Sequence, residues 1–293
     1  MNPVVNFGMN FGVNPGAPTV IIPVHNAADE LEACLASLYR TIPVGAGVLL
    51  LDDASDDPRV QPILQHWLDR AGPLWRGEKQ SRNLGFVGTV NRGMEMTRGN
   101  VVLLNSDTLL TPGWLQGLQR CLASDAAFAT ATPWTNHGEI ASFPIFCQAN
   151  PLPADINALA RVIASTGAAR YPEIPTAVGF CMAISRAAIE TLGPFDQELF
   201  GLGYGEENDF SMRARNTGMK NVLCDDVYVG HVGGRSFAPR GLAPGETSMR
   251  SLLSRHPAYL ELVSEFIAAD PLAGRRGELT AALVRAGIEL GRN

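Results

Sequence analysis

The sequence lacks the features that mark several large classes of protein. It has only five cysteines in 293 residues, and no two of them have CxxC spacing. This count argues against a disulfide framework or a cysteine-based zinc site, and it fits reduced thiols in the cytosol. No apolar run approaches the ~18 residues that cross a bilayer, and residues 1–16 do not read as a secretory signal. We therefore expect a cytoplasmic protein without a transmembrane segment, whose work at a membrane would be peripheral, at the inner face.

Basic charge and several nucleotide motifs are also scarce. The net charge of −6 argues against nucleic acid as a partner. The sequence contains no GxxxxGK[ST] phosphate loop and no GxSxG nucleophile elbow. The segment Gly85-Phe86-Val87-Gly88 does not fit GxGxxG, which counts against a dinucleotide oxidoreductase. No serine or cysteine stands beside a recognisable base, so a nucleophilic hydrolase is not indicated.

What the chain does contain is a regular alternation of apolar strands and amphipathic helices. Hydrophobic residues make up 46% of the sequence, enough for a substantial core. Short aliphatic runs at Thr19–Val24, Val48–Leu51 and Val101–Leu104 predict buried strands, and the leucine spacing of Asp29–Tyr39 predicts a helix that lies on a sheet. This alternation predicts an α/β fold with a Rossmann-like, doubly wound, mostly parallel sheet. Further strands are expected at Phe128–Thr132, Ala177–Ser185, Val222–Cys224 and Val227–Val229, and further helices at Gln61–Arg70, Leu115–Leu122, Ala154–Ser165, Arg186–Leu192 and Tyr204–Asn216.

The domain plan has three parts. We expect an N-terminal extension over residues 1–17, one α/β domain over 18–240 and a helical tail over 241–293. The tail carries two amphipathic patterns, at Pro257–Ala268 and Glu278–Leu290. It could dock on the domain, form a homodimer or hold the protein at a membrane. Its helices have mixed charge rather than a basic face, so membrane binding is the weakest of the three.

A potential metal ligand follows the most apolar strand. Val101–Leu104 leads directly into Asn105-Ser106-Asp107. Open parallel sheets bind ligands at the carboxyl ends of their strands, so Asp107 is expected at a ligand site. Its carboxylate is a hard oxygen ligand for Mg²⁺ or Mn²⁺. The alternative is a simple strand-end turn, which Asn, Ser and Asp all favour.

A second metal ligand could come from the only histidine in a glycine-rich loop. His231 lies within Gly230-His231-Val232-Gly233-Gly234-Arg235-Ser236. Its ring could supply a nitrogen to Mn²⁺, and the loop has the glycines and the cation that a lid over a diphosphate would need. Equally, His231 could be a structural histidine.

Acidic residues follow two other predicted elements. Asp53 follows the strand Val48–Leu51 and could accept hydrogen bonds from a nucleobase or a ribose, while the surrounding Asp52–Asp57 could instead cap the next helix. Glu206, Glu207 and Asp209 crowd one helix start. Carboxylates this close resist simultaneous ionisation, so one of them could act as a base, unless they only stabilise the helix dipole. Asp209 is four residues before Arg213, which favours an ion pair and a structural role.

Six segments in order resemble family 2 glycosyltransferases of the inverting GT-A type, over roughly residues 18–237. The opening strand with His25-Asn26 is similar to the first strand of that family, and Leu51-Asp52-Asp53-Ala54-Ser55 resembles its nucleotide-binding D-D/N-x-S motif. The other matches are Asn83-Leu84-Gly85 with Asn91-Arg92-Gly93 (N-x-G…N-x-G), Asn105-Ser106-Asp107 (D-x-D), Gly193-Pro194-Phe195-Asp196 with Glu206-Glu207-Asn208-Asp209-Phe210 (G-x-F-D…E-D-x-D-L) and His231-Val232-Gly233-Gly234 (H-x-G-G).

The resemblance implies a role for each matched residue. Asp53 would bind the base, Pro23 and His25 would line its pocket, and Asn83 and Ser106 would belong to the nucleotide site. Asp107 and His231 would hold Mn²⁺ or Mg²⁺ on the diphosphate. Glu207 would be the general base, with Glu206 as the alternative. The chain departs from the pattern at Asn105, which replaces the first acid of D-x-D, and at Glu207, which replaces an aspartate.

The acceptor side is the part least defined by the sequence. Residues 134–174 are rich in proline, glycine and asparagine and match no motif, so the acceptor side is placed there by elimination. Trp134 could stack on a sugar face, or it could pack in the core.

The function that the resemblance implies is transfer of a sugar, with inversion, from a UDP-, dTDP- or GDP-linked donor to a glycan or lipid-linked acceptor, as in cell-surface polysaccharide biosynthesis. A nucleotidyltransferase is one alternative, but it would need a basic glycine-rich loop near the N-terminus, and Val24-His25-Asn26-Ala27 is not one. A catalytically degenerate nucleotide- or glycan-binding module is the other, suggested by Asn105.

Overall fold

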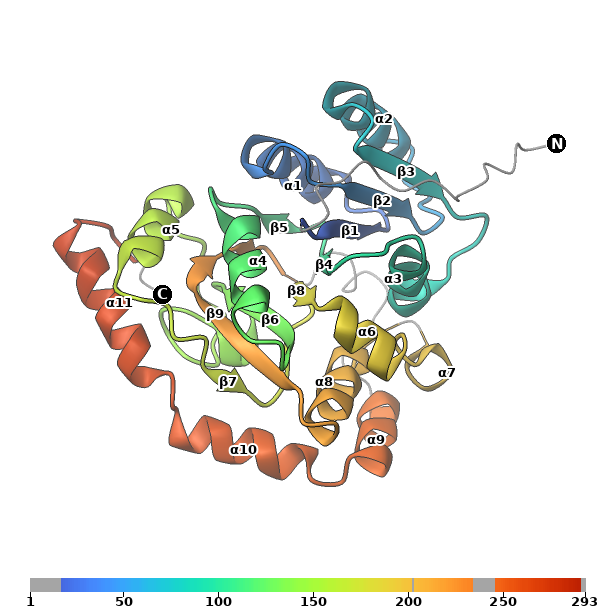
Figure 1. Ribbon diagram of the computed structural model, residues 1–293. Helices are drawn as coiled ribbons and strands as arrows, with labels where there is room; N and C mark the ends of the chain where they lie inside the picture. Colours follow the sequence, from blue (N-terminus) through green and yellow to red (C-terminus); the bar gives the residue numbers. More distant parts are fainter. Residues whose placement is uncertain (1–16, 202, 234–245, 291–293) are drawn as a thin grey trace.

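The computed structural model describes residues 17–201, 203–233 and 246–290 and is built around an eight-stranded sheet (Figure 1). The strand order is β3-β2-β1-β4-β8-β6-β9-β7. A separate two-stranded sheet joins β5 and β10. The strands are β1 (Thr19–Val24), β2 (Val48–Asp52), β3 (Trp75–Lys79), β4 (Val101–Leu104), β5 (Thr108–Leu109), β6 (Phe128–Trp134), β7 (Glu173–Ile174), β8 (Cys181–Ile184), β9 (Lys220–Tyr228) and β10 (Gly230–His231).

The predicted doubly wound, mostly parallel sheet is confirmed, with two antiparallel strands: β8 inside the sheet and the short edge strand β7, which pairs antiparallel with β9. Strand β1 lies in the centre and pairs in parallel with both β2 and β4. Strand β8 breaks the pattern, because it pairs antiparallel with β4 on one side and with β6 on the other. The strand Val101–Leu104 therefore has one parallel and one antiparallel neighbour. Its side chains are still fully buried on both faces, as the run of aliphatics predicts.

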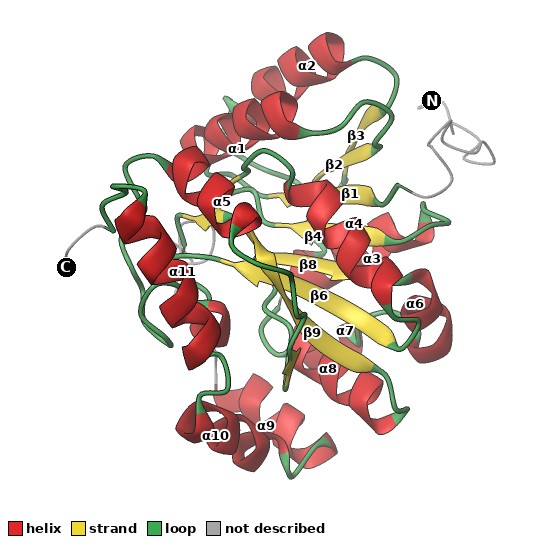
Figure 2. Cartoon of the chain, turned by 60° about the vertical axis from the view of Figure 1, so that its left-hand side comes forward, coloured by secondary structure: helices red, strands yellow, loops and turns green. Residues whose placement is uncertain are grey.

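Helices cover both faces of the sheet (Figure 2). Alternate residues of the central strands enter opposite cores: Val20 and Ile22 pack against α1, α2 and α4, whereas Ile21 packs on the side of α3, α6 and α8. The helices of the domain are α1 (Ala28–Thr41), α2 (Val60–Ala71), α3 (Gly85–Glu95), α4 (Trp114–Ser124), the 3₁₀ helix η1 (Glu139–Ala141), α5 (Ile156–Ser165), α6 (Arg186–Leu192), α7 (Gln197–Phe200) and α8 (Glu206–Asn216).

The C-terminal tail docks on the domain, which is one of the three arrangements that the sequence left open. Figure 1 shows its helices running in succession around the β7 and β9 side of the sheet, and they are α9 (Glu246–Arg255), α10 (Tyr259–Ala269) and α11 (Ala273–Arg285). Leu252 is buried with the core residues of α8, and Leu279 is buried against α5. A buried ion pair joins Arg275 Nε of α11 to Asp225 Oδ2 of β9 at 2.8 Å. Homodimer formation through the tail stays a prediction.

Several element boundaries differ from the sequence-based expectation. The two predicted strands Val222–Cys224 and Val227–Val229 form the single strand β9, because Asp225 is buried and paired rather than exposed in a turn. Strand β8 begins only at Cys181, and the last helix lies earlier than predicted. The expected extension falls outside the described residues apart from residue 17, as do the domain boundary at 240 and Gly234-Arg235-Ser236. No helix among the described residues is long and apolar enough to span a bilayer.

Candidate active site

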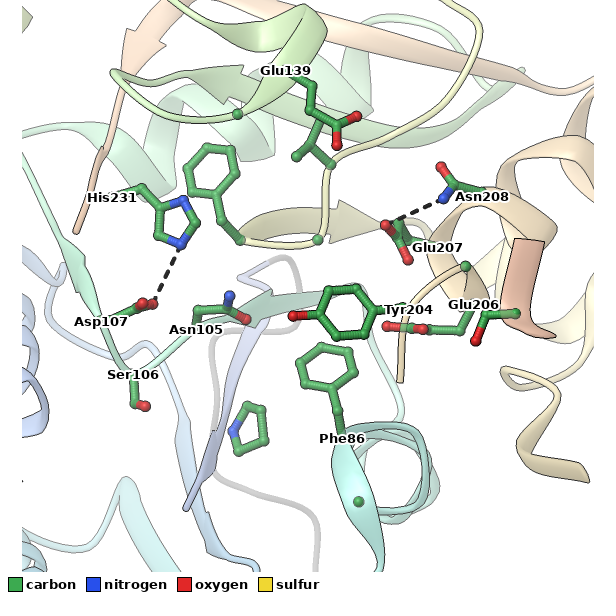
Figure 3. Close-up of a pocket in the computed structure, with 18 of the residues that line it drawn as sticks. Phe86, Asn105, Ser106, Asp107, Glu139, Tyr204, Glu206, Glu207, Asn208 and His231 are labelled. Atoms are coloured by element: carbon green, nitrogen blue, oxygen red, sulfur yellow. Dashed lines mark hydrogen bonds and ion pairs between the residues drawn. The ribbon is translucent and has the colours of Figure 1, made fainter. Parts of the chain in front are cut away.

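A cavity of about 450 Å³ opens at the carboxyl ends of the central strands (Figure 3). Most of the residues that the sequence singled out are gathered there. The described residues that line the cavity include no lysine and no arginine. The predicted site residues found in its wall are Pro23, His25, Asp53, Ser106, Asp107, Glu206, Glu207 and His231.

Asp107 and His231 meet at one end of the cavity because two short strands pair. Strands β5 and β10 are antiparallel, with His231 opposite Thr108, the residue after Asp107. His231 Nε2 lies 3.4 Å from Asp107 Oδ1, while its Nδ1 bonds the carbonyl oxygen of His137 at 2.7 Å. The backbone contact thus turns Nε2 toward the carboxylate. Burial opposes protonation of this ring, but the carboxylate of Asp107 outweighs it and raises the pKa of His231.

Phe180 forms the wall behind this pair. Its ring stacks on that of His231 with the centroids 5.2 Å apart, which fixes the plane of the imidazole. Among the described residues, no three side chains of histidine, cysteine, aspartate or glutamate are grouped to hold a metal ion. Any metal at this end would therefore have two protein ligands, Asp107 and His231, and would complete its shell with other oxygens.

Asp53 holds the backbone at the start of α3. Its Oδ1 accepts a hydrogen bond from the amide of Leu84 at 2.6 Å, and its Oδ2 accepts one from Gly85 at 3.0 Å. Asp53 therefore supports the start of α3, while Asp57 of the same cluster accepts a hydrogen bond from the amide of Arg59, the residue before α2, as the capping alternative predicts for the next helix. Gly85 has φ of 75°, which a side chain would disfavour, and this explains the glycine of the first N-x-G segment.

Asn83 lies under the cavity rather than in its wall. Its Nδ2 donates to the carbonyl oxygen of Asp53 and lies 3.2 Å from His25 Nδ1, so it supports Asp53 and His25 from behind. The second N-x-G segment is also structural. Asn91 bonds both the amide and the carbonyl oxygen of Phe195, which anchors the turn before α7.

Glu206 and Glu207 occupy the other end of the cavity, at the N-terminus of α8. Glu206 is only 5% exposed, and the Oε2 atoms of both glutamates are buried without a hydrogen-bond partner in the described structure. Burial raises the pKa of Glu207 to about 7. Burial and the neighbouring charge of Glu207 raise the pKa of Glu206 well above its usual value. A carboxyl group with a pKa near 7 is suited to accept a proton at neutral pH.

The orientation of Glu207 is set by a short chain of hydrogen bonds. Asn208 Nδ2 lies 3.4 Å from Glu207 Oε1, and Asn208 Oδ1 accepts a hydrogen bond from Thr176 Oγ1 at 2.8 Å. The amide of Asn208 therefore points its donor side at the carboxylate. Figure 3 shows Glu207 directed into the cavity, with Asn208 beside it.

Asp209 is structural, as the sequence predicted, but its network is larger than the expected pair. It is fully buried and bonds Arg213 Nε at 2.8 Å, Arg255 Nη1 at 3.1 Å and His256 Nε2 at 2.9 Å. Arg255 belongs to α9 and His256 follows it. The tail is therefore joined by ion pairs to the helix that carries Glu206 and Glu207.

Of the two roles that the sequence leaves open for Trp134, the structure shows core packing and contradicts stacking on an acceptor sugar. Its side chain is fully buried, packs against Phe143 with the ring centroids 5.9 Å apart and donates from Nε1 to the carbonyl oxygen of Asp225 at 3.3 Å. It cannot stack on a sugar in solvent. The sequence places the acceptor side in residues 134–174 only by elimination, which does not decide which way the side chain of Trp134 points.

Sequence reasoning also missed several residues of the cavity wall. Glu139 comes from η1, and Met249, Leu252 and Tyr259 come from the tail. Glu139 has no motif around it, and its direction results from an irregular backbone. The tail residues had a usable signal, because α9 carries an apolar leucine pair, but only the folded chain brings them to the cavity.

The fold and the acidic residues at the strand ends place this protein in the GT-A class of α/β proteins. The chain belongs to glycosyl transferase family 2, since the model of that family matches residues 19–193. It is 26% identical over 220 residues to the uncharacterized proteins Rv1525 of Mycobacterium tuberculosis and Mb1552 of Mycobacterium bovis, covering 73% of this chain and 73% of each of them.

Solved structures of low sequence identity share the fold. GalNAc-T7, crystallised with UDP, GalNAc and Mn²⁺, superposes with a TM-score of 0.63 at 17% identity. The match covers 94% of this chain and 59% of the GalNAc-T7 chain. The mannosyltransferase PcManGT of Pyrobaculum calidifontis, with GDP-Man and Mn²⁺, superposes with a TM-score of 0.54 at 17% identity. The match covers 95% of this chain and 90% of the PcManGT chain. S. aureus TarS 1–349 with UDP-GlcNAc superposes with a TM-score of 0.57 at 16% identity. The match covers 86% of this chain and 71% of the TarS chain. These likenesses show the fold.

Proposed function

We propose that the chain is an inverting glycosyltransferase that moves a sugar from a nucleoside diphosphate donor to a saccharide acceptor. One observation carries the proposal: a single cavity holds Asp107 with His231 at one end and a buried glutamate, Glu207, at the other. An inverting displacement needs these two functions on opposite sides of the anomeric carbon, because the leaving group and the nucleophile are in line.

Asp107 and His231 would hold a divalent cation, Mn²⁺ or Mg²⁺. Their donor set fits, since a carboxylate oxygen and an imidazole nitrogen are ligands that Mn²⁺ accepts. The described lining has no lysine or arginine, so a metal ion held by Asp107 and His231 would supply positive charge to a diphosphate there. When bound, such an ion neutralises charge on the leaving diphosphate. Three of the similar structures contain UDP, GDP-Man or UDP-GlcNAc, which supports a nucleotide-sugar donor.

The nucleotide would lie along the end of β1. Pro23 and His25 form that wall, and Asp53 holds the start of α3 beside it. Because both oxygens of Asp53 already accept backbone amides, its contact with a base would use the remaining lone pairs. Ser106 would contact the donor, because it precedes Asp107 in the chain and lines the same cavity.

Glu207 would act as the general base. The acceptor hydroxyl oxygen forms the new bond to the anomeric carbon while its proton passes to Glu207, and the bond from that carbon to the diphosphate oxygen breaks. The electron pair leaves with the nucleoside diphosphate, so the configuration inverts. Glu206 is next to Glu207 but more deeply buried, and it serves as the alternative base.

Glycans or lipid-linked saccharides of cell-surface polysaccharides are the proposed acceptors, with the enzyme in the cytoplasm or at the inner face of the membrane. The nucleotidyltransferase alternative is disfavoured, because the loop after β1 supplies His25 and Asn26 instead of cations. A degenerate binding module is disfavoured by the buried Oε2 atom of Glu207, which has no hydrogen-bond partner among the described residues and costs stability without serving binding of a donor.

The test is a thermal-shift panel of UDP-, GDP- and dTDP-sugars with and without Mn²⁺, followed by assays of nucleoside diphosphate release. The right donor should raise the melting temperature in the presence of Mn²⁺, and EDTA should abolish both the shift and turnover. Glu207→Gln should keep the shift and lose turnover. Full activity in this variant would refute the base assignment, and a product that retains the donor anomeric configuration would refute inversion.

A further inference from the structure

Glu139 lies at the end of the cavity that holds Glu207. Figure 3 shows the two carboxylates on the same side of the cavity, away from Asp107 and His231. The Glu139 side chain is exposed, and no hydrogen bond or ion pair to another described residue is found for it. Its backbone has φ of 48°, a left-handed conformation that glycine or asparagine would adopt with less strain. A glutamate at this position therefore calls for a reason other than the turn.

The cavity that Glu139 lines has both acidic and apolar residues in its wall. Glu206 and Glu207 present buried Oε2 atoms that have no partner among the described residues. Met249, Leu252 and Tyr259 of the tail form an apolar wall of the same cavity. The described lining of the cavity contains no lysine or arginine that would balance the charge of Glu139, or that of Glu207 once it ionises.

We propose that Glu139 binds the acceptor, that its carboxylate accepts hydrogen bonds from hydroxyls next to the attacking one, and that the reacting acceptor sugar is uncharged. A carboxylate has oxygens enough to accept bonds from two adjacent hydroxyls. The apolar wall suits the C–H face of a pyranose ring. An acceptor that carries a carboxylate or a phosphate on this ring is repelled by the carboxylate of Glu139, and also by Glu207 once Glu207 is ionised. The proposal rests on the proposed glycosyltransferase function.

Matched acceptors test the proposal. Aryl β-glucosides and β-galactosides are compared with the corresponding glucuronides and galacturonides, using the donor that the thermal-shift panel identifies. The wild-type protein should transfer to neutral members only. Glu139→Gln should raise the acceptor KM about 10- to 100-fold, the loss expected for a hydrogen bond to a charged group, and leave the donor KM unchanged. It should also narrow the preference for neutral over acidic acceptors.

Two further variants separate binding from folding. Glu139→Gly removes the carboxylate but suits the backbone, so it should lose acceptor affinity with no fall in melting temperature. Glu265→Gln, an exposed acid on α10 outside the cavity, is the matched control and should change neither KM.

The pH dependence of kcat distinguishes acceptor binding by Glu139 from a purely structural role of that residue, which would leave this dependence unchanged. The titratable groups around Glu207 are Glu139, Glu206, Tyr204 and Tyr259. Removing the Glu139 charge should shift the acid limb of kcat to lower pH, because its charge disfavours ionisation of Glu207.

The outcomes separate this inference from the proposed function. Failure of the wild type to turn over any donor refutes the function itself. Donor turnover with no transfer to neutral glycosides, equal use of uronides, or a wild-type acceptor KM in Glu139→Gln refutes the role of Glu139 and leaves the function standing.

Discussion

His256 Nε2 lies 2.9 Å from Asp209 Oδ1, and Asp209 is two residues beyond Glu207 on the same helix. The contact connects a residue after α9 with the first turns of α8, so the tail supports the helix that carries the proposed base. Because the match to the family model ends at residue 193, this support comes from a part of the chain beyond that match.

Removing Asp209 should therefore destabilise the protein strongly. Asp209 is fully buried, and its loss leaves Arg213, Arg255 and His256 without their carboxylate. We expect Asp209→Ala to lower the free energy of unfolding by about 3–5 kcal/mol, measured by urea denaturation. Asp29→Ala breaks an ion pair with Arg59 in which both side chains are exposed, and it should change little. Similar stability of the two variants would contradict the supporting role of the tail.

Turnover should depend on the ionisation of Glu207. Its pKa of about 7 means that the base is protonated in acid, so kcat should fall about tenfold per pH unit below that value. Glu207→Gln should lower kcat by about 10²- to 10⁴-fold at pH 8 with an unchanged donor Kd. Steady-state assays and calorimetric titration with the donor provide the two measurements. A kcat that stays constant from pH 5 to pH 8 would show that another group is the base.

The same glutamate should make the protein less stable at high pH. The pKa of Glu207 is raised from 4.5 to about 7 in the folded state, so the stability that its protonated form contributes is fully present below pH 4.5 and is lost as the pH rises through 7. Glutamine cannot lose a proton. We expect Glu207→Gln to be about 1–3 kcal/mol more stable than the wild type at pH 8 and equal to it near pH 4. Urea denaturation at the two pH values measures the difference, and equal stability at pH 8 would contradict the buried charge.

Introducing an aspartate at Asn105, where the D-x-D motif of the family has its first acid, should strengthen metal binding. Asn105 lines the cavity beside Asp107 and follows β4 directly. A second carboxylate there adds a hard ligand of the type that Mn²⁺ and Mg²⁺ prefer. Asn105→Asp should lower the Mn²⁺ concentration required for half-maximal donor binding, and Asp107→Asn should raise it. The measurement is a donor thermal shift against Mn²⁺ concentration, and an unchanged midpoint in Asp107→Asn would exclude that residue as a ligand.

Trp134 should matter for stability and not for the acceptor. Its indole is fully buried. Trp134→Ala should cost about 3–5 kcal/mol by urea denaturation, because it leaves a large cavity in the core. Trp134→Phe keeps most of the volume and should give an acceptor KM equal to that of the wild type. A large rise in the acceptor KM of Trp134→Phe would show that Trp134 contacts the acceptor, contrary to its buried position.

The local pattern of the sequence was enough to predict the sheet and the position of two acids. The aliphatic runs at β1, β2 and β4 marked buried strands, and parallel strands end at one edge of a sheet. Asp53 and Asp107 therefore had to lie near each other, whatever the details of the loops. The helix start at Glu206 was equally readable, because α8 begins where the acids are.

Only the tertiary structure decided what these residues contact. Asp53 turned its carboxylate to the amides of α3, Asp107 was joined to His231 by the pairing of β5 with β10, and Trp134 faced the core. Glu139 reached the cavity from an irregular turn, and the tail reached α8 through Asp209. Periodicity determines which face of a strand or helix is apolar, because that depends on near neighbours. The direction of a side chain in a loop depends on residues distant in the chain, so it is determined only when the chain folds.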